Sequence, residues 1–219
     1  MILETKNITK SYGDLQVLKG VDLQVKASEI VSIVGPSGAG KTTLLQILGT
    51  LEKPDNGSLI IDNNPVFDLK DKALSKFRNA NIGFIFQFHQ LLPEFTALEN
   101  AALPALIKGI EKQKAFAAAE QLLERLEVAH RKDHKPNELS GGEQQRVAVC
   151  RALINKPAIV LADEPSGNLD SKNAEALHKL FFELREELKQ TFIIVTHNNS
   201  LADMADRKLK MVDGLLLNS

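Results

Sequence analysis

A glycine-rich stretch that ends in a lysine and two threonines is the segment of this chain best suited to bind a polyphosphate. It matches the pattern G-x-x-x-x-G-K-[ST] and consists of Gly35, Pro36, Ser37, Gly38, Ala39, Gly40, Lys41, Thr42 and Thr43. Glycines leave backbone N–H groups free to surround phosphate oxygens, and the start of a following helix adds a positive dipole end. Lys41 would place a charge between the β and γ phosphates, and Thr42 would offer its hydroxyl to Mg²⁺. The pattern therefore predicts a nucleoside triphosphate site rather than a surface turn with an exposed lysine.

Two adjacent carboxylates follow an apolar run later in the chain. The run Ile-Val-Leu-Ala occupies 159–162, and Asp163 and Glu164 come directly after it. In a parallel sheet, ligands bind at the carboxyl ends of the strands. Asp163 is predicted to hold Mg²⁺ through water, and Glu164 to polarise the attacking water as a general base. Such a pair alone is often two solvated acids, but after a phosphate loop it indicates hydrolysis.

A second predicted helix also begins with two adjacent glycines. The residues concerned are Leu139, Ser140, Gly141, Gly142 and Glu143. Ser140 with Glu143 forms a capping box, but capping does not explain two glycines, each of which costs up to about 1 kcal/mol relative to alanine in a helix. Bare backbone at a helix start suits close approach of an anion. Because the chain already has one phosphate loop, we expect this second site to serve a nucleotide held by another copy.

The elements that position these residues alternate between strand and helix. Strands are predicted at 15–25, 29–34, 57–62, 82–86, 158–162, 192–196, 208–212 and 215–217, and helices from 41 onward and at 112–126 and 173–189. This alternation indicates an α/β fold with a mainly parallel sheet covered on both faces. The helical character of 97–153 indicates an inserted lobe. We expect one domain over 1–219, with 1–86 and 157–219 in the α/β lobe and about 87–156 in the helical lobe.

Composition narrows the class of protein. The 219 residues carry a net charge of −1, which gives no reason to expect a nucleic-acid partner. The single cysteine, Cys150, excludes an internal disulfide and fits a reducing compartment. No apolar run approaches the roughly 20 residues that cross a bilayer, and 1–10 lack the apolar centre of a signal peptide. We therefore expect a cytoplasmic protein whose membrane partners, if it has them, are other chains.

Along essentially its whole length the sequence resembles the ABC ATPase family. The Leu-Ser-Gly-Gly run at 139–142 is similar to the signature motif of that family. Gln87 matches the Q-loop glutamine, which in the family contacts Mg²⁺ and the attacking water, and His197 matches the switch histidine at the γ-phosphate. Tyr12 lies where the family stacks an aromatic ring on adenine, with Val17 beside it, and Asp170 in the D-loop is implied to act across a dimer.

The resemblance implies a P-loop NTPase core with an N-terminal antiparallel β subdomain and an inserted α-helical subdomain. It also implies a homodimer that closes head-to-tail on two ATP molecules with Mg²⁺, each between 35–43 of one chain and 139–143 of the other. Two positions depart from the family pattern. Asn198 stands where many members have aspartate, and 26–29 lack a common glycine. Neither is a catalytic position, so activity is expected.

Within the family, the segment after Gln87 most resembles the ATPases of bacterial lipoprotein-releasing complexes. The apolar residues of this segment are Phe88, Leu91, Leu92 and Phe95, and about half of them could instead pack in the core. The likeness implies docking of two integral membrane subunits near this segment, cargo lipoproteins handled by those subunits, and a location at the cytoplasmic face of the inner membrane. MacB-type exporters and FtsE-like cell-division ATPases remain alternatives. A soluble ABC protein of DNA repair or translation would usually bring coiled-coil insertions, a second cassette or a basic surface.

Overall fold

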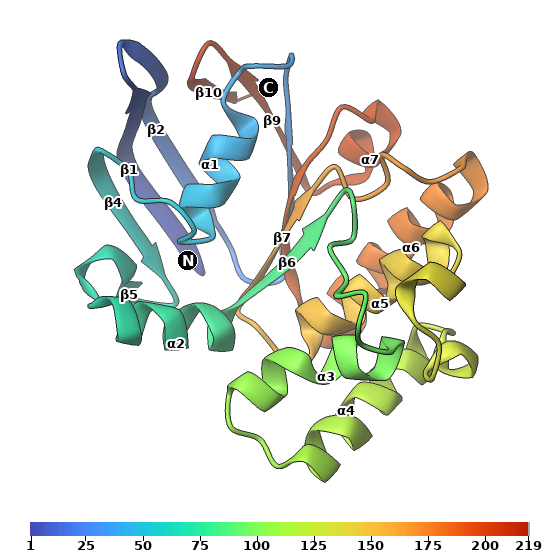
Figure 1. Ribbon diagram of the computed structural model, residues 1–219. Coiled ribbons are helices and arrows are strands. Elements are labelled where there is room, and N and C mark those ends of the chain that lie inside the picture. Colours follow the sequence, from blue (N-terminus) through green and yellow to red (C-terminus); the bar gives the residue numbers. More distant parts are fainter. Residues whose placement is uncertain (219) are drawn as a thin grey trace.

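The computed structural model describes residues 1–218, which form two sheets with helices between and around them (Figure 1). The strands are β1 (Leu3–Tyr12), β2 (Leu15–Val25), β3 (Ile30–Val34), β4 (Asn56–Ile61), β5 (Asn64–Pro65), β6 (Ile82–Phe86), β7 (Ile159–Asp163), β8 (Thr191–Val195), β9 (Arg207–Val212) and β10 (Leu215–Asn218). The helices are α1 (Lys41–Leu48), α2 (Asp71–Asn81), α3 (Ala97–Ile107), α4 (Lys112–Arg125), α5 (Gly141–Leu153), α6 (Ser171–Leu188) and α7 (Asn199–Met204).

The larger sheet brings together strands that are far apart in the sequence. Its order is β10-β9-β3-β8-β7-β6, and all neighbours pair in parallel except β10 with β9. In register, Phe86 of β6 lies beside Asp163 of β7, which lies beside Val195 of β8. The carboxyl ends of these strands therefore meet at one edge of the sheet, where the loops that follow them begin.

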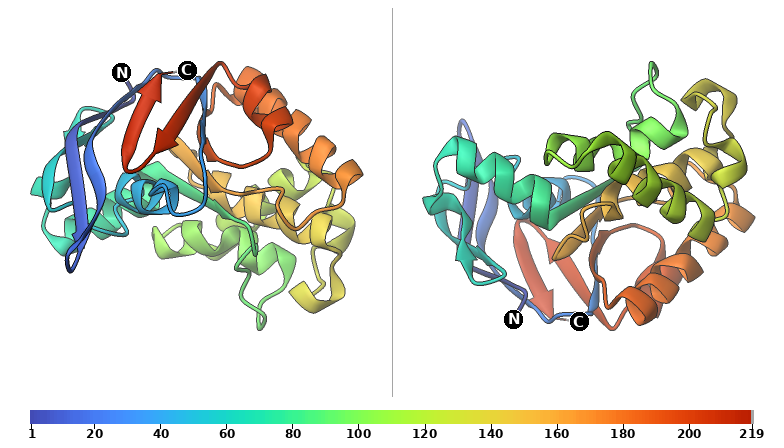
Figure 2. Two further views of the ribbon diagram at one scale, coloured as in Figure 1. Left: turned by 90° about the horizontal axis from the view of Figure 1, so that it is seen from above. Right: turned by 90° about the horizontal axis from the view of Figure 1, so that it is seen from below.

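Helix α1 separates the two sheets. The smaller sheet is antiparallel, in the order β2-β1-β4-β5, and α1 lies between it and the parallel sheet when the molecule is viewed along a perpendicular direction (Figure 2). The apolar side of α1 carries Leu44, Leu45, Ile47 and Leu48, all buried in a core that both sheets share. Because α1 follows directly after 35–40, this packing fixes the start of the helix against the edge of the parallel sheet.

A second core covers the other face of the parallel sheet. It joins side chains of α3, α4, α5 and α6 to β7 and β8. Helix α5 buries Val147, Val149 and Leu153, and the thiol of Cys150 is also fully buried, where desolvation raises its pKa. Between β6 and β7 the chain therefore contributes mainly helices, and α5 connects them to the sheet.

The α/β fold with a mainly parallel sheet and an N-terminal antiparallel sheet is confirmed, and the predicted strands lie within two residues of the observed ones. Helices α2 and α7 were not predicted. Leu74 is the one buried residue of α2. A segment with so few apolar positions lacks the apolar stripe that indicates a helix. Helix α7 is a short turn capped by the side chain of Asn198, which accepts from the N–H of Leu201.

Candidate functional site

The predicted phosphate loop forms one wall of a cavity of about 620 Å³ at the carboxyl edge of the parallel sheet. The cavity is lined by Leu15, Val17, Gly35, Ser37, Gly38, Gly40, Lys41, Thr42, Thr43, Gln87, Asp163, Glu164, Val195 and His197. The structure thus brings the loop together with residues that follow β6, β7 and β8. Two residues of the motif, Pro36 and Ala39, do not line the cavity, and Ala39 is buried beneath it.

Two glycines of the loop are required by its geometry. Gly40 has a φ of 100°, in the left-handed region, and a Cβ there would come within 2.9 Å of Leu18. A Cβ on Gly35 would lie 2.2 Å from the carbonyl oxygen of Met211, an impossible contact. The loop can therefore keep this path only with glycine at both positions, as a backbone cradle for phosphate requires.

The ammonium group of Lys41 is bound by the loop itself. Its Nζ donates to the carbonyl oxygens of Gly35 at 2.8 Å and Pro36 at 2.9 Å. Both acceptors are neutral, whereas a phosphate would offer charged oxygens to the same ammonium group and so add the attraction between opposite charges. The geometry thus holds Lys41 at the cavity, where an incoming phosphate can exchange with the carbonyls.

The residues predicted to hold Mg²⁺ meet directly. The Thr42 hydroxyl donates to Oδ2 of Asp163 at 3.2 Å. Burial raises the pKa of Asp163 above its ordinary value, and Thr42 and Lys41 offset this effect only in part. A half-buried carboxylate beside a hydroxyl is an all-oxygen donor pair of the kind that Mg²⁺ prefers, and a cation would relieve the cost of burying the charge. The residues therefore fit this metal.

Glu164 is oriented by the backbone and by His197. Its own N–H donates to the carbonyl of Val195 at 2.9 Å, and its φ is 45°. Its Oε2 accepts from the backbone N–H of His197 at 3.1 Å and lies 2.9 Å from Nδ1 of the same residue. The carboxylate thus sits at the cavity in a fixed orientation beside a largely exposed histidine, an arrangement able to accept a proton from water.

Gln87 has a partner that the sequence did not reveal. Its side-chain Nε2 donates to Oδ1 of Asn168 at 3.2 Å, and Nδ2 of Asn168 donates back to the carbonyl of Gln87 at 3.0 Å. A Cβ on the neighbouring Gly167 would lie 2.8 Å from the Gln87 amide nitrogen, so a larger residue at 167 would displace the Gln87 side chain. The loop after β6 is therefore tied to the loop after β7. No local pattern in the sequence marks Asn168 for this contact, which joins residues 81 positions apart.

The aromatic ring expected to stack on a base lies outside the cavity lining. Tyr12 is half exposed, and its hydroxyl donates to Glu52 at 2.5 Å, which raises the pKa of the phenol. Nζ of Lys10 lies 5.5 Å from the centre of its ring. Val17 does line the cavity, and so does Leu15, an exposed apolar residue that was not predicted. Leu15 is the first residue of β2, directly after the turn at 13–14, and no local pattern in the sequence marks it as part of the cavity.

The second helix start lies apart from this cavity. Ser140 caps α5, and its hydroxyl and the Glu143 carboxylate form the capping box. A Cβ on Gly142 would come within 2.9 Å of the end of the Asn173 side chain, which would have to shift to make room. At Gly141 the nearest atom to a Cβ is 3.7 Å away, on Leu169. Gly141 is thus the more open of the two glycines, and neither meets backbone atoms that would exclude a side chain.

Asp170 has a local role in the structure. It caps α6, with Oδ1 accepting from the backbone N–H of Asn173 at 3.0 Å and Oδ2 accepting from the Asn173 side chain at 2.5 Å. These bonds lower the pKa of the carboxyl group. The residue predicted to act across a dimer therefore already accepts two hydrogen bonds from Asn173 of its own chain.

The carboxylate of Glu143, which helps to cap α5, should make the stability of the fold depend on pH. Partial burial opposes ionisation of Glu143, but the Ser140 N–H, the Arg131 guanidinium at 2.9 Å and the Ser140 hydroxyl lower its pKa from 4.5 to about 2. The folded chain thus releases this proton more readily than the unfolded chain. The contribution of the ionised carboxylate to the free energy of unfolding is therefore fully present above about pH 4.5 and is lost as pH falls towards 2.

We expect Glu143→Gln to cost about 1–2 kcal/mol of unfolding free energy at pH 7 and much less near pH 2. Urea unfolding of both proteins across this pH range measures the difference. Glu183→Gln, an equal charge change on the exposed side of α6, is the control. A cost for Glu143→Gln that stays constant with pH would contradict the role of its charge.

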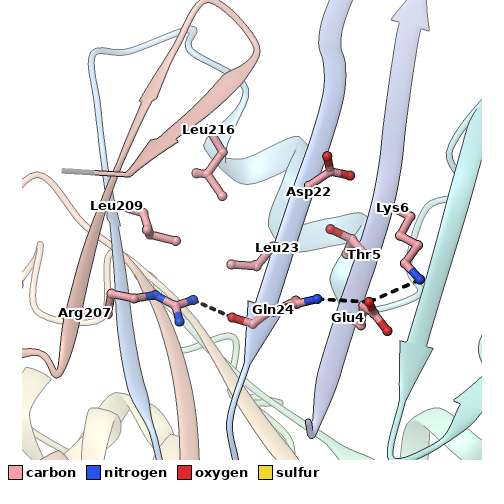
Figure 3. Close-up of a pocket in the computed structure, with 9 residues that line it drawn as sticks. All are labelled: Glu4, Thr5, Lys6, Asp22, Leu23, Gln24, Arg207, Leu209 and Leu216. Carbon is pink, nitrogen blue, oxygen red and sulfur yellow. Dashed lines mark hydrogen bonds and ion pairs between the residues drawn. The ribbon is translucent and has the colours of Figure 1, made fainter.

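A further cavity, of about 790 Å³, lies between the two sheets and contains none of the predicted residues (Figure 3). Several of its polar groups pair with one another: Arg207 donates to the carbonyl of Gln24, whose side chain donates to Glu4, which also pairs with Lys6. The figure shows this chain of contacts crossing from β9 to β1. Such mutual pairing indicates a structural role.

The sequence of this chain is similar to those of known proteins. Residues 18–167 match the family model described as ABC transporter. The lipoprotein-releasing system ATP-binding protein LolD of Bacteroides thetaiotaomicron is 61% identical over 215 residues, which cover 98% of this chain and 99% of that protein. The protein of the same name from Porphyromonas gingivalis is 59% identical over 218 residues and covers 100% of both chains.

Solved structures of the same kind share the fold. A dimeric ATP-binding cassette in a post-hydrolysis state, bound to ADP and Pi, superposes with a TM-score of 0.89 at 43% identity, over 98% of this chain and 96% of that one. A second dimeric structure, of a bacterial ABC transporter cassette, gives 0.90 at 44% identity with the same coverage. Among residues 1–218, no helix has both the length and the apolar character needed to cross a membrane.

Proposed function

The chain belongs to the ABC transporter family, and from this premise we propose that it is the ATPase subunit of a bacterial complex that releases lipoproteins from the inner membrane. The observation that carries the ATPase assignment is the convergence of Lys41, Thr42, Asp163, Glu164 and His197 on one cavity. The lipoprotein cargo rests on the likeness to proteins of that name over nearly the whole chain. The ATPase works at the cytoplasmic face, and the membrane subunits handle the cargo.

The reaction follows from the positions of the side chains. The phosphates of ATP lie along 35–43, where Lys41 exchanges its carbonyl acceptors for the β and γ phosphate oxygens. Thr42, Asp163 and Gln87 supply oxygen atoms for Mg²⁺, which neutralises phosphate charge when it is bound with ATP. Glu164 takes a proton from the attacking water, and His197, 2.9 Å away, holds the carboxylate and contacts the γ-phosphate.

A second copy of the chain completes the site. The open approach to Gly141 leaves the start of α5 free for a phosphate, yet Leu139–Glu143 do not line the cavity of their own chain. Two copies related by a two-fold axis would place each signature segment on the ATP held by the other. ATP then stabilises the closed dimer, and hydrolysis removes that stabilisation.

The membrane subunits dock beside the segment that follows Gln87, in the helical lobe proposed for about 87–156. We call Phe88 to Thr96 the docking segment. Phe88 is 73% exposed, and Leu92 and Phe95 are also exposed, which is unusual for apolar residues this close together. Beside the segment lies a cavity of about 380 Å³ whose lining includes Phe84, Phe86, Pro104 and Ile107. An amphipathic helix with apolar anchors fits such a surface.

The experiment that tests the function is capture of the tagged chain from native membranes in mild detergent. We expect two different integral membrane proteins in equal amounts, together with lipid-modified cargo. Cell-wall enzymes or their regulators in place of lipoproteins would instead indicate a cell-division role. Recovery of the chain without membrane proteins would remove the transport assignment.

Phe88→Asp should abolish this capture. Because the side chain is 73% exposed, its replacement should leave the melting temperature within about 2 °C of wild type, while a charge at the centre of an apolar interface costs 2 kcal/mol or more of binding, about 30-fold or greater in affinity. Leu217→Asp changes another exposed apolar side chain, 48% exposed, on β10 and should leave capture unchanged. Equal capture by wild type and Phe88→Asp would show that the partners bind elsewhere.

A further inference from the structure

The second and third residues of the docking segment have a strained conformation. His89 has a φ of 55° and Gln90 a φ of 48°, both in the left-handed region that residues other than glycine seldom adopt, least of all in succession. The turn is tight, since the N–H of His89 donates to Phe86 at 3.2 Å and that of Gln90 to Phe88 at 2.5 Å. Something outside the turn must hold it in this form.

One side chain from α5 does so. Nη1 of Arg151 donates to the carbonyl of Gln90 at 2.6 Å, and Nη2 donates to the carbonyl of His89 at 2.7 Å. A guanidinium fork can bond two adjacent carbonyls at once only when both point the same way, as the left-handed pair makes them do. Burial lowers the pKa of Arg151, in keeping with a charge enclosed by the segment.

The rest of the docking segment is held in the same manner from α3. Asn100 is fully buried, and its side chain binds both the N–H and the carbonyl of Leu92, as well as the carbonyls of Phe95 and Thr96. The exposed apolar side chains are thus carried by a backbone that lacks regular structure but is anchored at both ends to helices. Helices α3 and α5 pack against each other in one core.

We propose that Arg151 is a positioning residue that joins the docking segment and α5 into one rigid unit. Arg151 lies ten residues after Gly141 on the same helix, about 15 Å along its axis. A membrane subunit that displaces the docking segment therefore moves the start of α5, and with it the contact proposed for the other copy's ATP. This inference rests on the proposed function for its partner, but the clamp itself is a property of the isolated chain.

The first test uses the isolated chain and two matched arginines. Arg151→Lys keeps the charge but replaces the two-nitrogen fork with one nitrogen on a side chain of shorter reach, which weakens the bonds to the two carbonyls. Hydrogen exchange in the peptide containing 88–92 should therefore be about tenfold faster. Arg146→Lys is the control, because Arg146 lies on the same helix and donates to a carbonyl, that of Leu126 at 2.8 Å, away from the docking segment. Equal exchange in the two variants would overturn the clamp.

A second pair of variants leaves the core untouched if Arg151→Lys fails to fold. Gln90 is exposed, and valine strongly disfavours a positive φ whereas glycine accepts it. Gln90→Val should therefore speed exchange of the same peptide, and Gln90→Gly should not. In the double variant, Gln90→Gly should restore at least half of the protection that Arg151→Lys removes, which a merely space-filling arginine would not allow. Failure of the valine and glycine variants to differ would overturn the proposal.

The last measurement is the ratio of ATPase rates with and without the captured membrane subunits. Arg151→Lys and Gln90→Val should lower this ratio at least about threefold while Arg146→Lys keeps it, as expected for loss of a coupling of typical size. Faster hydrogen exchange in the docking segment with an unchanged ratio of ATPase rates would show that the segment does not transmit the effect of the membrane subunits to α5. If the wild-type chain shows no stimulation at all, the proposed function fails, and the exchange experiment still decides whether Arg151 is a clamp.

Discussion

Glu164→Gln is expected to lose ATP hydrolysis by a factor of about 10² to 10⁴ while still binding ATP. Glutamine has nearly the same shape, and its carbonyl oxygen can still accept the 3.1 Å hydrogen bond from His197 N–H, but it cannot take a proton from water. Because ATP would then remain in place, the variant should also accumulate as a dimer. Steady-state phosphate release and gel filtration with and without ATP measure the two effects.

The control for this variant is Glu183→Gln, which makes the same charge change on the exposed side of α6 and should hydrolyse ATP at the wild-type rate. A Glu164→Gln protein that turns over normally would show that another group is the base. Loss of ATP binding together with hydrolysis would instead assign Glu164 a role in holding the nucleotide.

The second large effect concerns the composite site. Gly141→Asp should leave the fold intact, because the nearest atom to a Cβ is 3.7 Å away and an acid in the first turn of a helix is favourable by up to about 1 kcal/mol. The same charge faces the phosphate that a second copy presents, so hydrolysis should fall at least about 100-fold. Lys41→Ala should lose ATP binding and be equally inactive.

Mixing the two inactive proteins tests whether the ATPase site is formed by two copies of the chain or by one copy alone. A dimer of one Gly141→Asp chain with one Lys41→Ala chain has one site in which both faces are intact. Random pairing makes half of the dimers mixed, and each has one of its two sites intact, so activity should return to about a quarter of wild type. No recovery in the mixture, with both proteins folded and dimers formed, would exclude a site shared between copies.

The sequence predicted the site better than it predicted the contacts within it. The strand at 82–86 and the acids after 162 could be placed because apolar runs followed by polar residues indicate the ends of buried strands. The reciprocal amide pair of Gln87 and Asn168 could not, since it depends on how two loops from neighbouring strands pack. Tyr12 shows the same limit, because its hydroxyl is directed to Glu52 by the approach of a loop after α1.

The clamp at Arg151 was equally hidden. Nothing in the local sequence of His89 and Gln90 indicates a left-handed turn, for which glycine or asparagine would be the usual residues. The conformation is imposed by a side chain more than sixty positions away. Tertiary contacts of this kind override local preference, and only a structure reveals them.

The pair of carbonyls that hold Lys41 has a consequence for nucleotide selectivity. An incoming ligand must offer the ammonium group more than two neutral dipoles already provide at 2.8 and 2.9 Å. A tail with several negative charges meets that threshold easily, whereas adenosine, with none, cannot meet it at all. The pocket should therefore select for negative charge, and ADP, which carries fewer negative charges than ATP, should be held less firmly.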